Sequence, residues 1–270
     1  MTLRLHFISG LPRSGSTLLS ALLTQNPRFY AGMSGPMGSL FTAMLAKMSG
    51  ENEFSMFINE TQKRAILKGV FENYYAAEKN KVVFDTNRLW CSKMPALAEL
   101  FPDAKVIACV RETAWIIDSI EGVIRRNSFE MSKIFNFEAG GTVFSRADGL
   151  SSGNGIVGFA MNALKEAYYG EHAKNLAILR YETLTSKPAE TMKAVYDFLG
   201  EKHFQHDFDN VTYSAEEFDA RLGTPGLHRV GKKVKFEKRD TILPPDIFRR
   251  YESDNFWQNP ALNKRGVRII

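Results

Sequence analysis

Hydrophobic residues along the chain recur at two spacings, one typical of strands and one typical of helices. Short apolar runs predict strands at Leu3–Ser9, Lys81–Phe84, Ala104–Val110 and Leu176–Arg180. The segments between them predict helices, which are expected at Ser16–Thr24, Met37–Met48, Phe54–Glu78, Met94–Phe101, Ala114–Arg126, Ile156–His172 and Ala189–Leu199. The C-terminal part reads as mostly irregular, with a short helix near Pro245–Tyr251.

The order of these elements decides the fold class. Strands that alternate with helices imply parallel strands covered by helices on both faces, and therefore an α/β fold. Ligands of such sheets bind beyond the carboxyl ends of the strands. Polar or charged residues follow an apolar strand at four such ends: Ser9–Thr17, Asp85–Arg88, Arg111–Thr113 and Arg180–Glu182.

Composition narrows the setting in which the protein works. A chain of 270 residues can bury roughly 75% of its unfolded surface, so one large core is feasible. No stretch approaches the roughly 20 apolar residues that cross a bilayer, and the N-terminus has the pattern of a strand rather than of a secretory signal. Cys91 and Cys109 are too few for a disulfide framework or a metal cage. We therefore expect a cytoplasmic protein.

The turn after the first predicted strand carries the strongest chemical signal. It reads Gly-Leu-Pro-Arg-Ser-Gly-Ser-Thr over residues 10–17, between a strand and a helix. Glycines let the backbone turn its N–H groups inward, and a helix N-terminus adds partial positive charge, so the segment can cradle an anion. The spacing is that of a P-loop, but Ser16 stands where nucleotide kinases have Lys. The cation is Arg13 instead, whose guanidinium can bind a pair of sulfate or phosphate oxygens.

This loop resembles the 5′-phosphosulfate loop of the sulfotransferases that use 3′-phosphoadenosine-5′-phosphosulfate (PAPS). The Arg form, followed by two leucines, is similar to the protein-tyrosine sulfotransferases and their bacterial relatives. The resemblance implies one P-loop-like, three-layer α/β/α domain over residues 1–270, with a central parallel sheet of about five strands. It also implies PAPS as sulfuryl donor, 3′-phosphoadenosine-5′-phosphate (PAP) as product, and no metal. The loop residues that it assigns to the donor are Arg13, Ser14, Gly15, Ser16 and Thr17.

A second anion site is expected for the 3′-phosphate of the donor. In the family an Arg ends a later strand and a Ser follows eight residues on, and Arg111 and Ser119 have this spacing. Guanidinium and hydroxyl donors suit a doubly charged phosphate. The alternative is that Arg111 is a surface residue paired with Glu112 or Asp118.

Two later segments resemble further parts of the donor site. Tyr181 matches a tyrosine that lies near the adenine in the family, and the alternative is an ordinary half-buried Tyr. Residues 224–233 resemble the basic loop that closes over the 3′-phosphate, with Arg229 and Lys232 as the candidates. A solvated run of charges is the alternative there.

The general base is harder to assign. Residues 18–50 contain neither Asp nor Glu, and no His stands between residues 7 and 171, so both bases used by relatives are missing. Asp85 is the first polar residue after a predicted strand, and we hypothesise that it is the base, with Asn87 and Arg88 orienting acceptor or sulfate. Asp85 could instead cap the next turn or pair with Arg88. His6 is a weaker alternative, because it lies within a strand and is expected to be packed.

These features predict a sulfotransferase (EC 2.8.2 type) that moves a sulfuryl group from PAPS to a hydroxyl or amine by in-line displacement. We expect a small-molecule acceptor, with neither nucleic acid nor membrane as partner, and homodimer formation is left open. The Met- and Phe-rich segments Ala31–Phe57 and Asn127–Gly155 could line the acceptor pocket or belong to the core.

Two other function classes were considered. A P-loop kinase or NTPase that uses ATP and Mg²⁺ would need Lys at position 16 and an Asp at the end of an apolar strand, where Arg111 stands. A nucleic-acid-binding module would suit the net charge of +5, but the basic residues are scattered and no nucleic-acid motif is present.

Overall fold

The computed structural model describes residues 3–50, 53–135 and 141–270 of the chain. In these residues the strands form one sheet of six, in the order β2-β3-β1-β4-β5-β6, and every neighbouring pair is parallel. The strands are β1 (Arg4–Gly10), β2 (Phe29–Ala31), β3 (Val82–Thr86), β4 (Val106–Val110), β5 (Leu176–Arg180) and β6 (Arg268–Ile269). The predicted parallel α/β fold is confirmed, and β2 and β6 are additional short edge strands.

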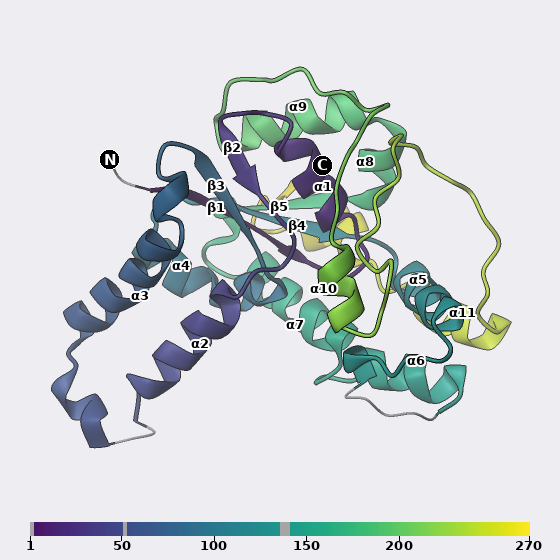
Figure 1. The fold of residues 1–270 in the computed structure, drawn as a ribbon, viewed down its shortest axis with the longest axis horizontal. Coiled ribbons are helices and arrows are strands. Elements are labelled where there is room, and N and C mark those ends of the chain that lie inside the picture. The colour runs from purple at the N-terminus through teal and green to yellow at the C-terminus, as the bar shows by residue number, and fades with distance from the viewer. Residues whose placement is uncertain (1–2, 51–52, 136–140) are drawn as a thin grey trace.

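Helices cover both faces of this sheet (Figure 1). They are α1 (Ser16–Leu23), α2 (Met37–Lys47), α3 (Glu60–Tyr74), α4 (Met94–Leu100), α5 (Thr113–Arg126), α6 (Val143–Ser151), α7 (Ile156–Tyr169), α8 (Tyr181–Ser186), α9 (Pro188–Leu199), α10 (Glu216–Arg221) and α11 (Pro245–Tyr251). Short 3-10 turns span Glu53–Phe57, Ala76–Glu78, Arg88–Lys93, Lys133–Phe135, Ala173–Asn175, Phe256–Gln258 and Pro260–Leu262.

Alternation along the strands divides the core into two hydrophobic clusters. Phe7 of β1 faces the cluster that includes residues of α3, α4, α5 and α7, while Ile8 faces the cluster built with α1 and α9. Both side chains are fully buried. Two apolar layers of this kind bury β3 and β4 over their whole length and β1 beyond Arg4, which explains why these strands are mostly apolar on both faces.

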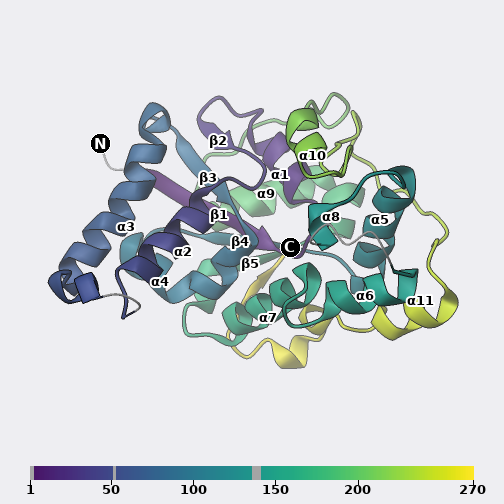
Figure 2. The same cartoon turned by 60° about the horizontal axis from the view of Figure 1, so that its bottom comes forward.

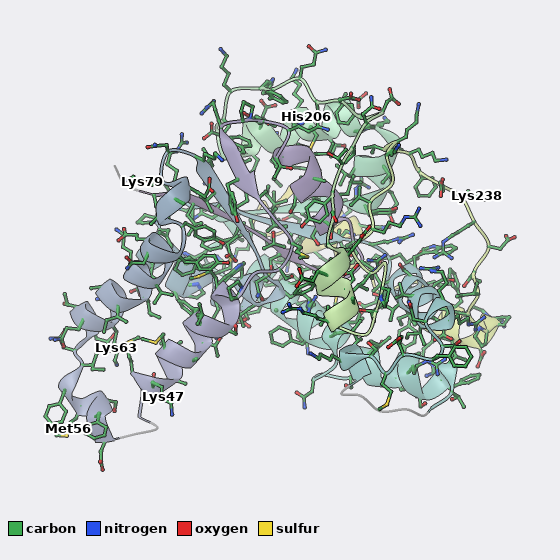
Figure 3. All side chains as sticks on the ribbon, viewed as in Figure 1. Lys47, Met56, Lys63, Lys79, His206 and Lys238 are labelled. Carbon is green, nitrogen blue, oxygen red and sulfur yellow. The ribbon has the colours of Figure 1, made fainter. Side chains whose placement is uncertain are left out.

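Helices α2 and α3 lie side by side and extend away from the sheet (Figures 1 and 2). Figure 3 places Lys47, Met56 and Lys63 toward the far end of this pair, and Met56 is 79% exposed. Helix α3 begins at a capping box in which the Asn59 side chain accepts from the backbone of Gln62. The predicted helix 54–78 is therefore divided into a 3-10 turn, α3 and a second 3-10 turn.

The end of β3 differs from the prediction in a way that matters for the site. The strand continues through Asp85 to Thr86, with Asp85 opposite Phe7 of β1. Because side chains alternate along a strand, Asp85 shares the face of Val83 and points into the core. Helix α10 was also missed by the sequence analysis, and it lies beside α1 in Figures 1 and 2.

Candidate functional site

A cavity of about 450 Å³ lies at the carboxyl ends of β1, β3, β4 and β5. This is the edge at which parallel sheets bind ligands. Its walls come from the loop after β1, the turn after β3, the middle of α5, the start of α8, and the segment 227–239. The predicted site residues that line it are Arg13, Gly15, Ser16, Thr17, Asn87, Arg88, Arg111, Ser119, Tyr181, Arg229 and Lys232.

The loop between β1 and α1 owes its shape to three positive φ angles. Gly10 has φ of +98°, and a Cβ there would lie 2.2 Å from the carbonyl oxygen of Cys109 on β4. Gly15 has φ of +92° and directly precedes α1, whose first turn has no side-chain cap. The free N–H groups of that turn therefore face the cavity end of the helix, where an anion can accept from them.

Arg13 is the third residue with positive φ, at +58°, and its side chain joins the loop to α5. Its Nε donates to the hydroxyl of Ser119 at 3.1 Å, and a terminal nitrogen donates to the carbonyl of Leu227. Burial and the neighbouring Arg111 lower the pKa of Arg13 to about 10, which leaves it fully charged near neutral pH. Loop, α5 and the segment after α10 thus meet at one guanidinium.

Arg111 and Tyr181 form the next part of the wall. The guanidinium carbon of Arg111 lies 4.3 Å from the centre of the Tyr181 ring, a cation–π arrangement. The same ring borders the loop, since a Cβ on Gly15 would lie 3.0 Å from it. Burial lowers the pKa of Arg111. Arg111 makes no ion pair with Glu112 or Asp118, so the structure does not support the alternative of a surface ion pair.

Positive charge in the cavity is only partly compensated. Lys233, Lys235 and Arg239 pair with carboxylates. Within the described ranges, no carboxylate forms an ion pair with Arg13, Arg88, Arg111, Arg229 or Lys232. Cations gathered around a cavity without a counter-charge favour an anionic ligand with more than one anionic group.

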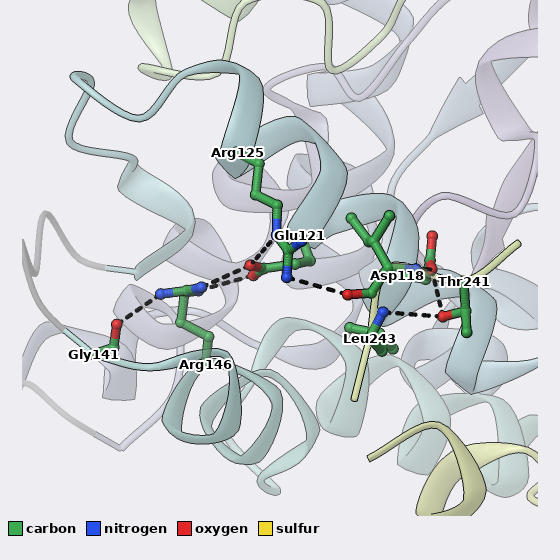
Figure 4. A network of polar contacts seen from close by, with 8 residues as sticks. Asp118, Glu121, Arg125, Gly141, Arg146, Thr241 and Leu243 are labelled. Atoms are coloured by element: carbon green, nitrogen blue, oxygen red, sulfur yellow. Dashed lines mark hydrogen bonds and ion pairs between the residues drawn. The ribbon is translucent and has the colours of Figure 1, made fainter. Parts of the chain in front are cut away.

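The segment that closes the cavity is fixed to α5 by a buried carboxylate (Figure 4). Asp118 accepts from the Thr241 hydroxyl at 2.7 Å and from the Ile242 N–H at 2.8 Å, and it pairs with Arg239. Glu121, one turn further along α5, pairs instead with Arg125 and Arg146. Asp118 thus holds the basic segment over the cavity. Glu121 holds α6, and its partner Arg125 also donates to the carbonyl of Ile242 at 3.1 Å.

Two predicted residues do not line the cavity. Ser14 is buried, and its hydroxyl donates to the carbonyl of Pro12 at 3.2 Å, so it shapes the loop. Asp85 is 1% exposed and accepts from Trp90 Nε1 at 2.7 Å and from the Tyr75 hydroxyl. Burial raises the pKa of Asp85. The hypothesis that Asp85 is the general base is therefore corrected: its carboxyl group belongs to a buried polar cluster and does not line the cavity.

His6 is likewise a packed side chain, as expected. Its Nδ1 accepts from the Lys105 N–H at 3.0 Å, and burial lowers its pKa to about 4. The two candidate acceptor segments contribute one lining residue each, Ser34 and Ile134, and residues 136–140 of the second segment lie outside the described residues. Most of the described part of these segments therefore serves the core or the surface.

The cavity also holds titratable residues that were not predicted from the sequence, and His228 is one of them. His228 lines it, and its Nδ1 lies 2.5 Å from Oδ1 of Asp219 on α10. The sequence signal for His228 is weak, because the residue lies in a basic segment and its carboxylate partner, Asp219, lies nine positions upstream. Across the described ranges, no group of three or more His, Cys, Asp or Glu could hold a metal ion, and no helix could span a membrane.

Comparison with known proteins agrees with this architecture. A family model described as the sulfotransferase family matches residues 6–206. The sulfotransferase domain from the curacin biosynthetic pathway is 14% identical, with a TM-score of 0.52 over 98% of this chain and 96% of that one. A sulfotransferase from Alicyclobacillus acidocaldarius is 16% identical, with a TM-score of 0.50 over 82% and 92%. No curated protein matches the sequence. The family match spans most of the chain and includes the loop, Arg111, Ser119 and Tyr181, and we conclude that the chain belongs to the sulfotransferase family.

Proposed function

We propose that the protein transfers a sulfuryl group from PAPS to a hydroxyl or amine group of a small molecule. The observation that carries this proposal is the set of cavity cations without carboxylate partners, arranged around a glycine loop that opens a helix. PAPS carries anionic groups at both ends of a nucleoside, and the cavity offers cations at two places. When bound, PAPS supplies the sulfuryl group and leaves as PAP.

Two groups of residues divide the donor between them. Arg13 and the N–H groups of Gly15, Ser16 and Thr17 would bind the phosphosulfate, where the helix N-terminus adds its partial charge. Further residues would bind the 3′-phosphate and border the adenine, and these are Arg111, Ser119, Arg229, Lys232 and Tyr181. Ser14 supports the loop from within through its bond to Pro12.

Arg13 has the capacity for a role in the chemistry. A guanidinium has five N–H donors, and the described contacts to Ser119 and Leu227 use two of them. The remaining N–H groups can donate hydrogen bonds to the leaving phosphate as negative charge builds on it. In a partly buried site such donors stabilise developing charge more strongly than water does.

Asn87 and Arg88 are proposed to meet the acceptor. Both line the cavity from the turn after β3. The Asn87 side chain is fixed, because it accepts from the Leu89 N–H at 3.0 Å and packs against Gly38, where a Cβ would lie 2.4 Å from its nitrogen. The Arg88 guanidinium has no carboxylate partner among the described residues, and burial lowers its pKa.

A magnesium-dependent kinase is the alternative function, and family membership argues against it. Isothermal calorimetry separates the two directly. We expect PAP to bind in buffer with EDTA and to bind more weakly as salt rises, because phosphate recognition here is electrostatic. Binding of ATP only in the presence of Mg²⁺, with none of PAP, would contradict the proposal.

The acceptor class is tested with ³⁵S-labelled PAPS and a panel of alcohols, phenols and amines, with labelled products counted after separation. We expect transfer to a small molecule that carries a hydroxyl or amine group. The reaction should need neither nucleic acid nor membrane. Transfer only to a tyrosine-containing protein, with none to the panel, would overturn the small-molecule assignment while leaving PAPS as donor.

A further inference from the structure

The cavity contains a His–Asp pair to which the donor assignment gives no role. His228 lines the cavity, and Asp219 on α10 is buried behind it. We infer that His228 is the general base for the acceptor and that Asp219 positions it. This inference rests on the proposed sulfotransferase function and adds the proton acceptor that Asp85 does not supply.

Two contacts of the ring and one of the backbone hold His228 in place. Nδ1 lies 2.5 Å from Oδ1 of Asp219, and the His228 backbone N–H donates to Oδ2 of the same carboxylate at 2.8 Å. The ring of Phe218 packs against the imidazole at a centroid distance of 5.5 Å in an edge arrangement. A side chain fixed in this way loses little entropy when it engages an acceptor.

The Asp219 contact determines which nitrogen can accept a proton. A buried carboxylate accepts hydrogen bonds, so Nδ1 carries the hydrogen and Nε2 carries the lone pair. Across the described chain, Nε2 of His228 has no hydrogen-bond partner. The basic nitrogen is therefore free on a side chain that lines the cavity.

His228 also directly follows the residue that contacts Arg13, the cation proposed to stabilise the charge on the leaving phosphate. The carbonyl of Leu227, the preceding residue, accepts from Arg13. The proposed electrophilic group therefore holds the backbone next to the proposed base. An in-line displacement needs both, one for the incoming oxygen and one for the departing oxygen.

Glu237 is the carboxylate among the described lining residues, and it is poorly suited to the same task. It pairs with Lys235 at 2.7 Å, and this hydrogen bond lowers the pKa of Glu237. Its side chain is 66% exposed, so water would compete for it. His228 combines a free basic nitrogen with partial burial, as a general base requires.

The step assigned to these residues is a displacement at the sulfur atom of PAPS. The acceptor oxygen forms a bond to sulfur, and the bond between sulfur and the 5′-phosphate oxygen breaks. The electron pair of that bond leaves with PAP, and the acceptor proton moves to Nε2 of His228. Asp219 stabilises the imidazolium that results. The same scheme holds with water as acceptor, in which case PAPS is hydrolysed to sulfate and PAP.

The test compares three variants of the full chain. His228→Gln removes the base, and Asp219→Asn removes the charge that positions it. His203→Gln is the matched control, because His203 forms a similar 2.6 Å pair with Asp197 but on the exposed surface. Transfer from ³⁵S-labelled PAPS to a panel of phenols and alcohols, and sulfate release to water, are measured at saturating donor. PAP affinity is measured by calorimetry.

We expect His228→Gln to lower both rates by roughly 10²- to 10⁴-fold, the usual contribution of a general base. Asp219→Asn should lower kcat by about 10-fold or more through misorientation of the ring. PAP affinity should stay within about threefold in both variants, and His203→Gln should match wild type. Retained turnover in His228→Gln, or a fall in PAP affinity that accounts for its lost rate, would overturn the inference.

A readout without turnover completes the test. The ¹⁵N signals of the His228 imidazole should show the hydrogen on Nδ1, and Asp219→Asn should weaken that preference. A hydrogen on Nε2 in wild type would overturn the inference whatever the acceptor. If the wild-type protein does not bind PAP, the proposed donor function itself is contradicted, so the two failures are distinguishable.

Discussion

Nε of Arg13 donates to the hydroxyl of Ser119 at 3.1 Å, although the two residues are 106 positions apart in the chain. The bond ties the loop after β1 to α5, and so joins the residues proposed for the two anionic ends of the donor. Each side chain limits the motion of the other before any ligand binds. Pre-ordering of this kind lowers the entropy that binding would otherwise cost.

Removal of the Arg13 guanidinium should affect the chemistry more than donor binding. We expect Arg13→Ala to lower turnover by roughly 10²- to 10³-fold, which is typical for the loss of one donor to developing charge. The turnover of Arg13→Lys should lie between those of wild type and Arg13→Ala, because lysine keeps the positive charge and lacks the planar guanidinium fork. Transfer rates at saturating PAPS check this, and near-normal turnover in Arg13→Ala would remove Arg13 from the reaction.

Arg111 should contribute to affinity instead. A charge-assisted hydrogen bond is worth about 1.5–3 kcal/mol, so Arg111→Ala should weaken PAP binding by roughly 10- to 100-fold with a smaller effect on kcat. Arg64→Ala is the control, because Arg64 pairs with Glu99 on the exposed surface and does not line the cavity. Calorimetry at two salt concentrations checks the result; equal PAP affinities in the two variants would contradict the 3′-phosphate assignment.

The parts of the site that the sequence predicts share one property, which is that each motif is local. The loop of residues 10–17 and the pair Arg111 and Ser119 each lie within one strand–turn–helix unit. Parallel strands bring their carboxyl ends to one edge, so local motifs are assembled there by the topology alone. No knowledge of side-chain packing is needed for that step.

The parts that the sequence does not predict depend on details beyond one unit. Asp85 points into the core and not into the predicted crevice, because β3 continues to Thr86 and successive side chains of a strand point to opposite faces. His228 gains its role from Asp219 on α10, a helix of only six residues in a segment without clear periodicity. Strands β2 and β6 have three and two residues, too few to show alternation.

Asp118 should control the segment over the cavity, and Arg146 on α6 offers a control that makes no contact with that segment. Asp118→Asn weakens the contacts to Arg239, Thr241 and Ile242, so residues 229–243 should exchange amide hydrogens faster and PAP affinity should fall by about 10-fold. Arg146→Ala should loosen α6, keep the contact of Arg125 with the Ile242 carbonyl, and leave PAP affinity unchanged. Equal effects of the two variants on PAP affinity would show that the Asp118 anchor has no special role.

Asp85 should matter for stability rather than for turnover. In Asp85→Ala the Tyr75 hydroxyl and the Trp90 N–H lose their buried acceptor, at a cost of about 1–3 kcal/mol. In Asp85→Asn the amide oxygen can still accept from Trp90, and the amide N–H can donate to the Tyr75 oxygen. Turnover of Asp85→Asn should match wild type, whereas loss of a general base would lower it by roughly 10²- to 10⁴-fold.

The pH dependence of stability gives Asp85 a second signature. Burial raises the pKa of its carboxyl in the folded state above the ordinary value of 3.8, so the folded protein holds this proton more tightly than the unfolded chain. The contribution of Asp85 to stability is therefore full below the ordinary pKa and is lost as pH rises through the raised value. The amide introduced by Asp85→Asn cannot titrate, so this variant should gain stability relative to wild type as pH rises across that interval. Urea unfolding from pH 4 to 8 measures the difference, and a variant that instead loses stability relative to wild type with rising pH would mean that the native fold prefers the carboxylate ionised.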